Sequence, residues 1–334
     1  MLNNLQGARA LAAISVVLLH VGASARDHSV NTPLFSSLGN WGNSGVDLFF
    51  VISGFIMVYV QDRSPRSPGR FLVDRAVRIV PLYSVMTLAL FGLLIVAQSV
   101  VRSPAPEMGH LTASFLFLSK AIYGLDPVLY VGWTLEYEAL FYLIFALSIV
   151  LSKPCSGGQK LLLILSSALI LLVLTGLAPP IVLEFLYGAA IARVRHLIGL
   201  RTGWLFMVGG GVLLALTIGH DIAIEARWIF WGLPAAIFLM GCTIVPQISN
   251  GLVTRLGDAS FSLYLTHVFV ISALMKVYSL IPVVIEGDVW AAVVCGVAIL
   301  VGILVHRYFE QPLTQLVRRG VTWIDSLNRR TAVV

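Results

Sequence analysis

The chain has 334 residues, of which 58% are hydrophobic and 11% are charged, and its formal net charge is +6. A soluble globular domain carries about 25% charged residues, so this composition excludes an ordinary soluble enzyme and indicates an integral membrane protein. The excess of Lys and Arg does not require a nucleic-acid partner, because cytoplasmic loops of membrane proteins carry such an excess. The three cysteines are widely spaced and predict neither a structural zinc site nor a disulfide framework.

Apolar segments of roughly 18 residues or more, long enough to cross a hydrocarbon core of ~30 Å, recur along the chain. They predict an all-α integral membrane protein with about ten transmembrane helices. These helices are expected at residues 8–25, 42–60, 79–101, 131–151, 160–176, 178–194, 203–220, 228–247, 259–280 and 288–306. Residues 111–119 are too short to span the bilayer and predict an interfacial or re-entrant piece.

The distribution of Lys and Arg predicts the orientation of the chain. If the N-terminus is cytoplasmic, 17 of the 22 Lys and Arg residues fall in cytoplasmic segments, which favours both termini inside. We expect one transmembrane domain over residues 1–310 and a short basic cytoplasmic tail over residues 311–334. Residues 1–25 also resemble a signal peptide, but the first span of a multi-spanning protein can start insertion without cleavage.

The first predicted span carries two ionisable residues, Arg9 and His20. They are eleven residues apart, close to three helical turns, so both side chains face one way and lie ~16 Å apart along the axis. Arg9 would then lie at the cytoplasmic end and His20 in the outer half. Taken singly, Arg9 fits a snorkelling anchor and His20 a packed polar residue. Together on one face they favour a cavity or pathway.

Three further spans bring carboxylates to a similar depth. Asp47, Glu138 and Glu184 are each expected in the outer half of the membrane, in one layer with His20. A carboxylate paired with His20 would hold its imidazole in one tautomer and keep it basic, as a general base requires. The alternative is a hydrogen-bond network that holds the helices together.

The loop before the third span is basic. Arg75 and Arg78 are three residues apart and share a helix face, with Arg70 nearby. Guanidinium groups pair with phosphate oxygens, so the cluster suits a polyphosphate, although positive-inside bias alone also explains it. In the ninth span, Tyr264 and His267 are expected on one side of the helix near mid-membrane.

Several motifs occur in an order that resembles a known family. LQGARALAAISVVLLH is similar to the Arg-x10-His signature of the acyltransferase 3 family of multi-spanning membrane acyltransferases. The resemblance continues through GNSGVDLFFVISGFIM, FLVDRAVRIVPLY, GWTLEYEALFY, LGDASFSLYLTH and HRYFEQP, and it covers nearly the whole chain. The fourth motif departs from the family pattern of adjacent acids, because Glu136 and Glu138 are separated by one residue.

The resemblance implies transfer of an acyl group, commonly acetyl, from acyl-coenzyme A to a hydroxyl of a glycan or small molecule. His20 would be the general base, with Glu138 or Asp47 orienting its ring. Coenzyme A would bind the arginines at positions 9, 70, 75 and 78. The further residues expected in the substrate pocket are Ser53, Trp133, Tyr142, Glu184, Tyr264 and His267. We expect no metal and no tightly bound cofactor, since acyl-coenzyme A is a substrate.

The expected setting is the bacterial inner membrane, with acyl-coenzyme A, a glycan or lipid-linked glycan, and the bilayer as partners. Other acyl donors such as succinyl, non-glycan acceptors such as a macrolide, and an acyl-enzyme formed on a histidine or on Ser53 stay open. A transporter or flippase of a lipid-linked glycan is a further alternative, but we find no matching pair of broken helices in inverted repeats. The sequence leaves the oligomeric state open.

Overall fold

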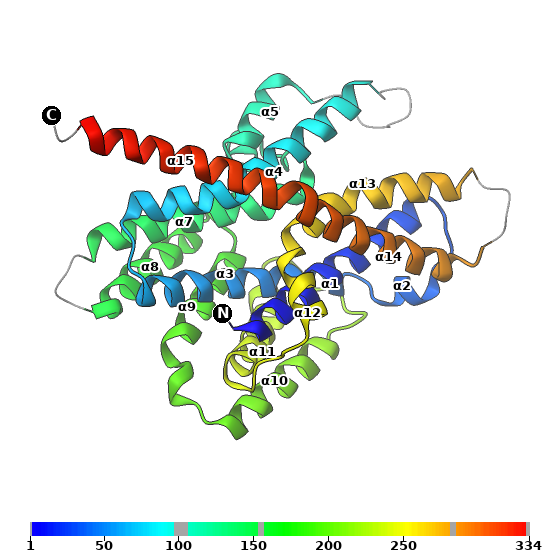
Figure 1. The fold of residues 1–334 in the computed structure, drawn as a ribbon. Helices are drawn as coiled ribbons and strands as arrows, with labels where there is room; N and C mark the ends of the chain where they lie inside the picture. Colours follow the sequence, from blue (N-terminus) through cyan, green and yellow to red (C-terminus); the bar gives the residue numbers. More distant parts are fainter. Residues whose placement is uncertain (1, 97–105, 153–156, 281–284, 332–334) are drawn as a thin grey trace.

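The computed structural model describes residues 2–96, 106–152, 157–280 and 285–331, and these residues form helices joined by turns, with no strand among them (Figure 1). Six helices are long and apolar enough to cross a membrane, the last of them continuing into the C-terminal helix. They are α1 (Asn3–Asp27), α3 (Ser44–Arg63), α4 (Pro68–Val96), α7 (Trp133–Leu151), α13 (Ser260–Tyr278) and α14 (Gly287–Val305). The predicted all-α membrane fold is confirmed.

The remaining predicted spans coincide with shorter helices. These are α8 (Gly157–Leu174), α9 (Glu184–Val194), α10 (Leu200–Ala215) and α11 (Leu233–Ile244). Short helical turns extend two of them: η3 (Pro180–Leu183) precedes α9, and the π-helical turn η5 (Trp228–Gly232) precedes α11. The prediction of ten spans therefore stays a prediction.

Smaller helices occupy the connections. They are α2 (Pro33–Ser37), η1 (Trp41–Asn43), α5 (Met108–Phe115), α6 (Ser119–Tyr123), η2 (Tyr130–Gly132), η4 (Arg195–Leu197) and α12 (Gly251–Asp258). The segment predicted as an interfacial piece at residues 111–119 corresponds to α5 and the start of α6. The segment expected as a basic tail is helical in its described part, because the π-helical turn η6 (His306–Glu310) leads into α15 (Gln311–Thr331).

Glycines bring the central helices close together. A Cβ atom on Gly45 of α3 would collide with the carbonyl oxygen of Ala12 in α1, and one on Gly54 would collide with the carbonyl oxygen of Phe185 in α9. Small residues at helix interfaces permit such close backbone contact, which is a common packing device in membranes. These contacts fix the rotation of α3, and with it the directions in which Asp47 and Ser53 point.

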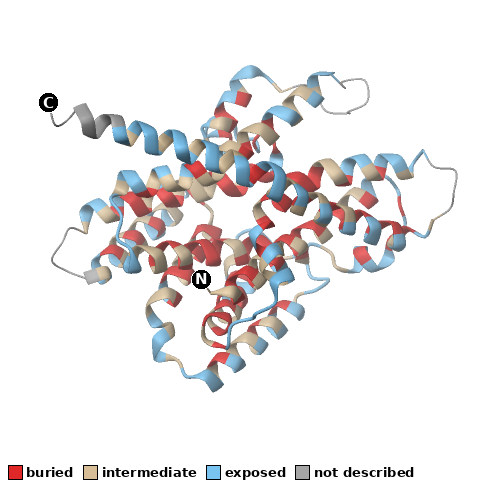
Figure 2. Cartoon of the chain, viewed as in Figure 1, coloured by how far each residue is buried: buried red, intermediate tan, exposed pale blue. Residues whose placement is uncertain are grey.

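Buried residues gather along the helices at the centre of the bundle, whereas α15 and the outer faces are largely exposed (Figure 2). Large apolar side chains stay exposed on the peripheral helices, including Leu163 and Leu174 on α8 and Leu205 on α10. Many exposed large apolar side chains are unfavourable in water and are accommodated by lipid. This pattern agrees with a chain embedded in a bilayer.

Candidate functional site

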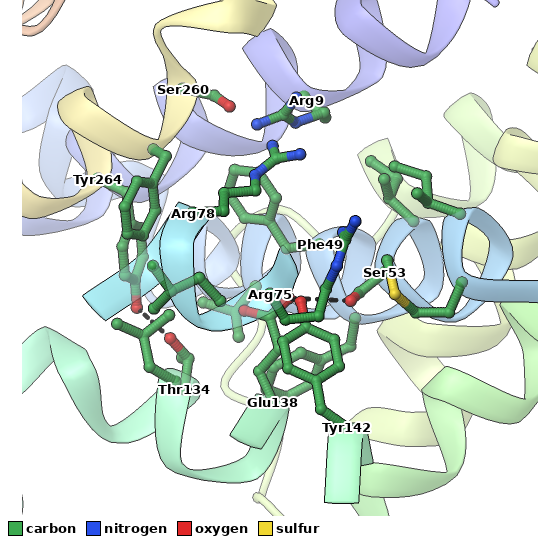
Figure 3. Close-up of a pocket in the computed structure, with 18 residues that line it drawn as sticks. Arg9, Phe49, Ser53, Arg75, Arg78, Thr134, Glu138, Tyr142, Ser260 and Tyr264 are labelled. Atoms are coloured by element: carbon green, nitrogen blue, oxygen red, sulfur yellow. Dashed lines mark hydrogen bonds between the residues drawn. The ribbon is translucent and has the colours of Figure 1, made fainter. Parts of the chain in front are cut away.

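Five helices, α1, α3, α4, α7 and α13, surround a cavity of about 100 Å³ (Figure 3). Its walls are mostly apolar, with contributions from Phe49 and Ile79 among others. Its polar lining consists of Arg9, Ser53, Arg75, Arg78, Thr134, Glu138, Tyr142, Ser260 and Tyr264. We call it the arginine cavity, because three guanidinium groups from two helices enter it.

The three arginines outnumber the carboxylates of the cavity. Arg9 comes from α1, and Arg75 and Arg78 come from one face of α4, so the predicted convergence of these three residues is seen (Figure 3). The Arg9 guanidinium donates to Oε1 of Gln6 at 3.0 Å, and the Nε of Arg75 is buried without a hydrogen-bond partner. Glu138 is the acidic residue of the lining. Such a surplus of half-buried positive charge favours an anionic ligand.

Arg70 lies outside the arginine cavity. Its guanidinium contacts Oδ1 of Asp74 at 3.3 Å and Oδ2 of Asp325 in α15 at 2.8 Å, and its side chain is 42% exposed. The predicted grouping of Arg70 with Arg75 and Arg78 is therefore corrected. Because α4 begins at Pro68, all three arginines lie on one helix, and five residues rotate Arg70 by ~140° from Arg75.

Glu138 is held by two hydroxyl groups. Ser53 of α3 donates to its Oε1 at 2.9 Å, and Tyr142, one turn along α7, donates to the same oxygen. Both partners belong to the predicted substrate pocket, and both line the cavity. The neighbouring acid Glu136 points elsewhere, where its carboxylate accepts the backbone N–H groups of Ser119 and Lys120. Glu136 thus fixes the start of α6, and Glu138 serves the cavity.

His20 lies beside the cavity rather than in its lining. Its Nδ1 is 2.8 Å from the carbonyl oxygen of Val16, and its ring centroid is 4.8 Å from that of His267 and 5.7 Å from that of Tyr130. The ring centroid of His267 is in turn 6.0 Å from that of Tyr264, and Tyr264 lines the cavity. A row of rings therefore connects His20 with the cavity.

The hydrogen bond to Val16 assigns the tautomer of His20. A carbonyl oxygen only accepts, so Nδ1 carries the proton and Nε2 keeps its lone pair. The expectation that Glu138 or Asp47 orients this ring is corrected, because the described contact that fixes it is a backbone carbonyl of its own helix. The resulting tautomer is the one a general base needs at Nε2.

The other two predicted carboxylates form a separate cluster. Asp47 and Glu184 are fully buried, and Nη2 of Arg227 donates to Oδ2 of Asp47 at 2.6 Å and to the carbonyl oxygen of Asn43 at 3.0 Å. Glu184 interacts electrostatically with both Asp47 and Arg227. The predicted single layer is therefore divided: Glu138 lies in the arginine cavity, His20 lies beside it, and Asp47 and Glu184 form the separate cluster.

Sequence reasoning missed Arg227, Thr134 and Ser260. Arg227 directly precedes the predicted span at residues 228–247, and the signal that could have found it is that a buried acid such as Asp47 requires a cation. Thr134 Oγ1 shares a 2.8 Å hydrogen bond with Tyr264 Oη, which also donates to the carbonyl oxygen of Val131 at 2.7 Å. Ser260 lines the cavity, and its hydroxyl has no hydrogen-bond partner. No sequence signal marks these two hydroxyls.

The predicted residues Ser53, Tyr142, Tyr264 and Glu138 thus meet in the arginine cavity, whereas Trp133 points away from it. Trp133 borders a second cavity together with Tyr137. Within the part of the chain that the structure describes, no group of three or more His, Cys, Asp or Glu side chains is arranged to hold a metal ion.

Comparison with known proteins places this geometry in a family. The family model described as an acyltransferase domain, Acyl_transf_3, matches residues 2–308. The chain is 32% identical to the exopolysaccharide production protein ExoZ of Rhizobium meliloti (strain 1021), over 84% of this chain and 90% of that protein. It is 26% identical to the acyltransferase MdmB of Streptomyces mycarofaciens, over 95% of this chain and 93% of that protein. No solved structure matches. The chain therefore belongs to the acyltransferase 3 family of membrane proteins.

Proposed function

We propose that this acyltransferase moves an acyl group, most simply acetyl, from acyl-coenzyme A to a hydroxyl of a cell-surface or exported glycan. The observation that carries the proposal is the arginine cavity, in which Arg9, Arg75 and Arg78 face one carboxylate, that of Glu138. Coenzyme A carries several phosphate charges at one end and a narrow, weakly polar thioester arm at the other. Guanidinium groups suit the phosphates, and the apolar walls suit the arm.

A glycan acceptor is supported by the relatives. ExoZ is named as an exopolysaccharide production protein, and it aligns with most of this chain. The charge distribution that predicts a cytoplasmic N-terminus puts Arg9 on the side where acyl-coenzyme A is made. A glycan that leaves the cell would meet the protein on the other side. We place the protein in the bacterial inner membrane on this basis.

In the proposed mechanism, Nε2 of His20 removes the proton of the acceptor hydroxyl as its oxygen attacks the thioester carbonyl carbon. A C–O bond forms, the C–S bond breaks, and coenzyme A leaves with the electron pair on sulfur. The proton on His20 then passes to that sulfur, so the histidine returns to its starting tautomer. The carbonyl of Val16 keeps Nδ1–H in place throughout, because it accepts that proton's hydrogen bond in both charge states of the ring.

The test compares His20 of α1 with His28, the residue that follows the end of that helix. Purified protein in lipid nanodiscs is supplied with acetyl-coenzyme A and, in parallel, succinyl-coenzyme A, with O-deacylated exopolysaccharide as acceptor. Release of coenzyme A and the mass gain of the polysaccharide report transfer. We expect His20→Ala to lose at least 100-fold in rate, a range typical of general-base removal.

His28→Ala is the matched control, because the Nδ1 of His28 contacts the carbonyl oxygen of Ser24 at 2.9 Å in the same i to i−4 arrangement while its side chain is exposed. We expect this variant to keep its rate. Full activity of folded His20→Ala would contradict the proposed role of His20. Glycan movement across vesicle membranes without any use of acyl-coenzyme A would favour a flippase.

A further inference from the structure

A second cavity lies on the other side of the first two turns of α7. It encloses about 490 Å³ and is bordered by α6, the start of α7, the connection from α8 to η3, and residues 224–227. None of its lining residues belongs to the lining of the arginine cavity. All four bordering segments fall in the part of the sequence that the charge distribution assigns to the outer side. We call it the outer cleft.

The outer cleft combines aromatic faces with charged groups. Trp133 and Tyr137 lie one turn apart on α7, with ring centroids 6.0 Å apart and planes at 80°. Lys120 and Asp126 form an ion pair of 2.7 Å at its border, and Glu225 is exposed there. Aromatic rings accept the weakly polar faces of a sugar ring, and carboxylate and ammonium groups hydrogen-bond its hydroxyls. The volume lies within the ~300–1,000 Å³ of ordinary ligand sites.

A buried cation stands in the wall of the outer cleft. Arg227 is only 6% exposed, its Nη2 is held by Asp47 at 2.6 Å, and its Nε is buried without a hydrogen-bond partner. An unpartnered buried donor is costly unless a ligand satisfies it. Because Arg227 also lines the cleft, its positive charge favours a hydroxyl or carboxylate oxygen of a sugar bound there.

We propose that the outer cleft binds the sugar of the acceptor, an inference that rests on the proposed acyl transfer to a glycan. Trp133 and Tyr137 face the cleft, whereas Thr134 and Glu138 face the arginine cavity. Successive residues of an α-helix are rotated by ~100°, so donor and acceptor occupy adjacent faces of α7. Tyr130, which contacts the ring of His20, belongs to the turn η2 directly before Trp133. The sugar would thus lie on the face of α7 adjacent to the donor's cavity, without competing for that cavity.

The experiment blocks the outer cleft from the outside. Glu225→Cys and, as the matched control, Asp221→Cys are made in a background in which Cys155 is replaced by Ala. Asp221 is exposed, lies four residues earlier in the same segment, and does not line the cleft. The remaining cysteines, Cys242 and Cys295, are buried. Right-side-out vesicles are loaded with acetyl-coenzyme A, and base-deacylated exopolysaccharide of the host strain is supplied outside.

A bulky, membrane-impermeant maleimide is then added, and transfer is measured before and after labelling on the same vesicles. We expect labelling to lower transfer at least tenfold in Glu225→Cys and to leave Asp221→Cys unchanged. Equal transfer before and after labelling of Glu225→Cys, with complete modification shown by mass spectrometry, would overturn the cleft assignment. Absence of transfer in the unlabelled parent would instead overturn the proposed function.

A kinetic variant gives an independent readout. Tyr137→Ala removes one aromatic face of the cleft without touching the arginine cavity. We expect its KM for the polysaccharide to rise at least fivefold, while its KM for acetyl-coenzyme A stays within twofold of the parent value. An equal rise in both KM values would show a structural effect and would contradict a separate acceptor site.

Discussion

The arginine cavity and the Asp47 cluster carry opposite charge imbalances. In the arginine cavity three guanidinium groups face the single carboxylate of Glu138, whereas in the cluster the two carboxylates of Asp47 and Glu184 face the single guanidinium of Arg227. The cavity leaves about 100 Å³ of free space, below the ~300–1,000 Å³ of a whole ligand site, so it has room for part of a donor. Asp47 and Glu184, by contrast, are fully enclosed by protein.

This difference separates a binding role from a structural one. A buried charge is tolerated where a partner compensates it, and removing that partner leaves an uncompensated ion in a medium of low dielectric constant. Within the cluster, the ion pair with Arg227 compensates Asp47, whereas both carboxylate oxygens of Glu184 are buried without a hydrogen-bond partner. The excess positive charge of the half-buried cavity arginines favours an anion from outside. We therefore expect substitutions in the cluster to change stability first, and substitutions in the cavity to change donor binding first.

The largest expected effect is a loss of stability in Asp47→Ala. The substitution leaves Arg227 buried without its closest anion, which costs about 3–5 kcal/mol for a buried pair, at the lower end here because Glu184 remains nearby. Thermal unfolding in detergent, followed by tryptophan fluorescence, measures the loss. Asp62→Ala on the same helix is the control, because its pair with Arg193, at 2.8 Å, is partly exposed and contributes ~0–1 kcal/mol. Equal losses in the two variants would contradict the structural role of the cluster.

The sequence was sufficient to predict where the helices lie along the chain, but not which face of each helix points to which neighbour. Hydropathy located a helix at each predicted span, because lipid imposes long apolar segments. The grouping of Arg9 with Arg75 and Arg78 was implied by the family resemblance, whereas helix spacing alone aligns only Arg75 and Arg78. The position of Arg70 was predictable in principle, because the ~140° between Arg70 and Arg75 follows from helix geometry once α4 begins at Pro68.

The division of the carboxylates between two sites was not predictable from one sequence. Asp47 and Ser53 lie on the same helix, yet the first turns to Arg227 and the second to Glu138. The rotation of α3 is set by close backbone contacts at Gly45 and Gly54, and these involve segments distant along the chain. Depth in the membrane can be counted along a helix, whereas rotation requires knowledge of the neighbours.

A second, smaller effect is expected for donor binding in Arg78→Ala. A charge-assisted hydrogen bond to phosphate contributes about 1.5–3 kcal/mol, which corresponds to a roughly 10- to 150-fold weaker Kd for coenzyme A. Titration calorimetry in nanodiscs at two salt concentrations measures it. Arg70→Ala is the matched control on the same helix, because its ion pairs with Asp74 and Asp325 lie outside the cavity. If Arg70→Ala weakened coenzyme A binding as much as Arg78→Ala does, Arg70 would belong to the donor site after all.

The smallest expected effect distinguishes direct transfer from an acyl-enzyme. Ser53 donates one of the two described hydroxyl hydrogen bonds to Glu138, and Tyr142 donates the other. Ser53→Ala therefore removes ~1 kcal/mol of support for the carboxylate, and we expect a fall in kcat/KM of about fivefold. Tyr142→Phe, which removes the other hydroxyl from the same oxygen, is expected to lose a similar amount. If folded Ser53→Ala lost transfer completely while Tyr142→Phe kept its activity, the Ser53 hydroxyl would itself react with the donor. Mass spectrometry of the intact protein after a single turnover would then detect the acyl-serine.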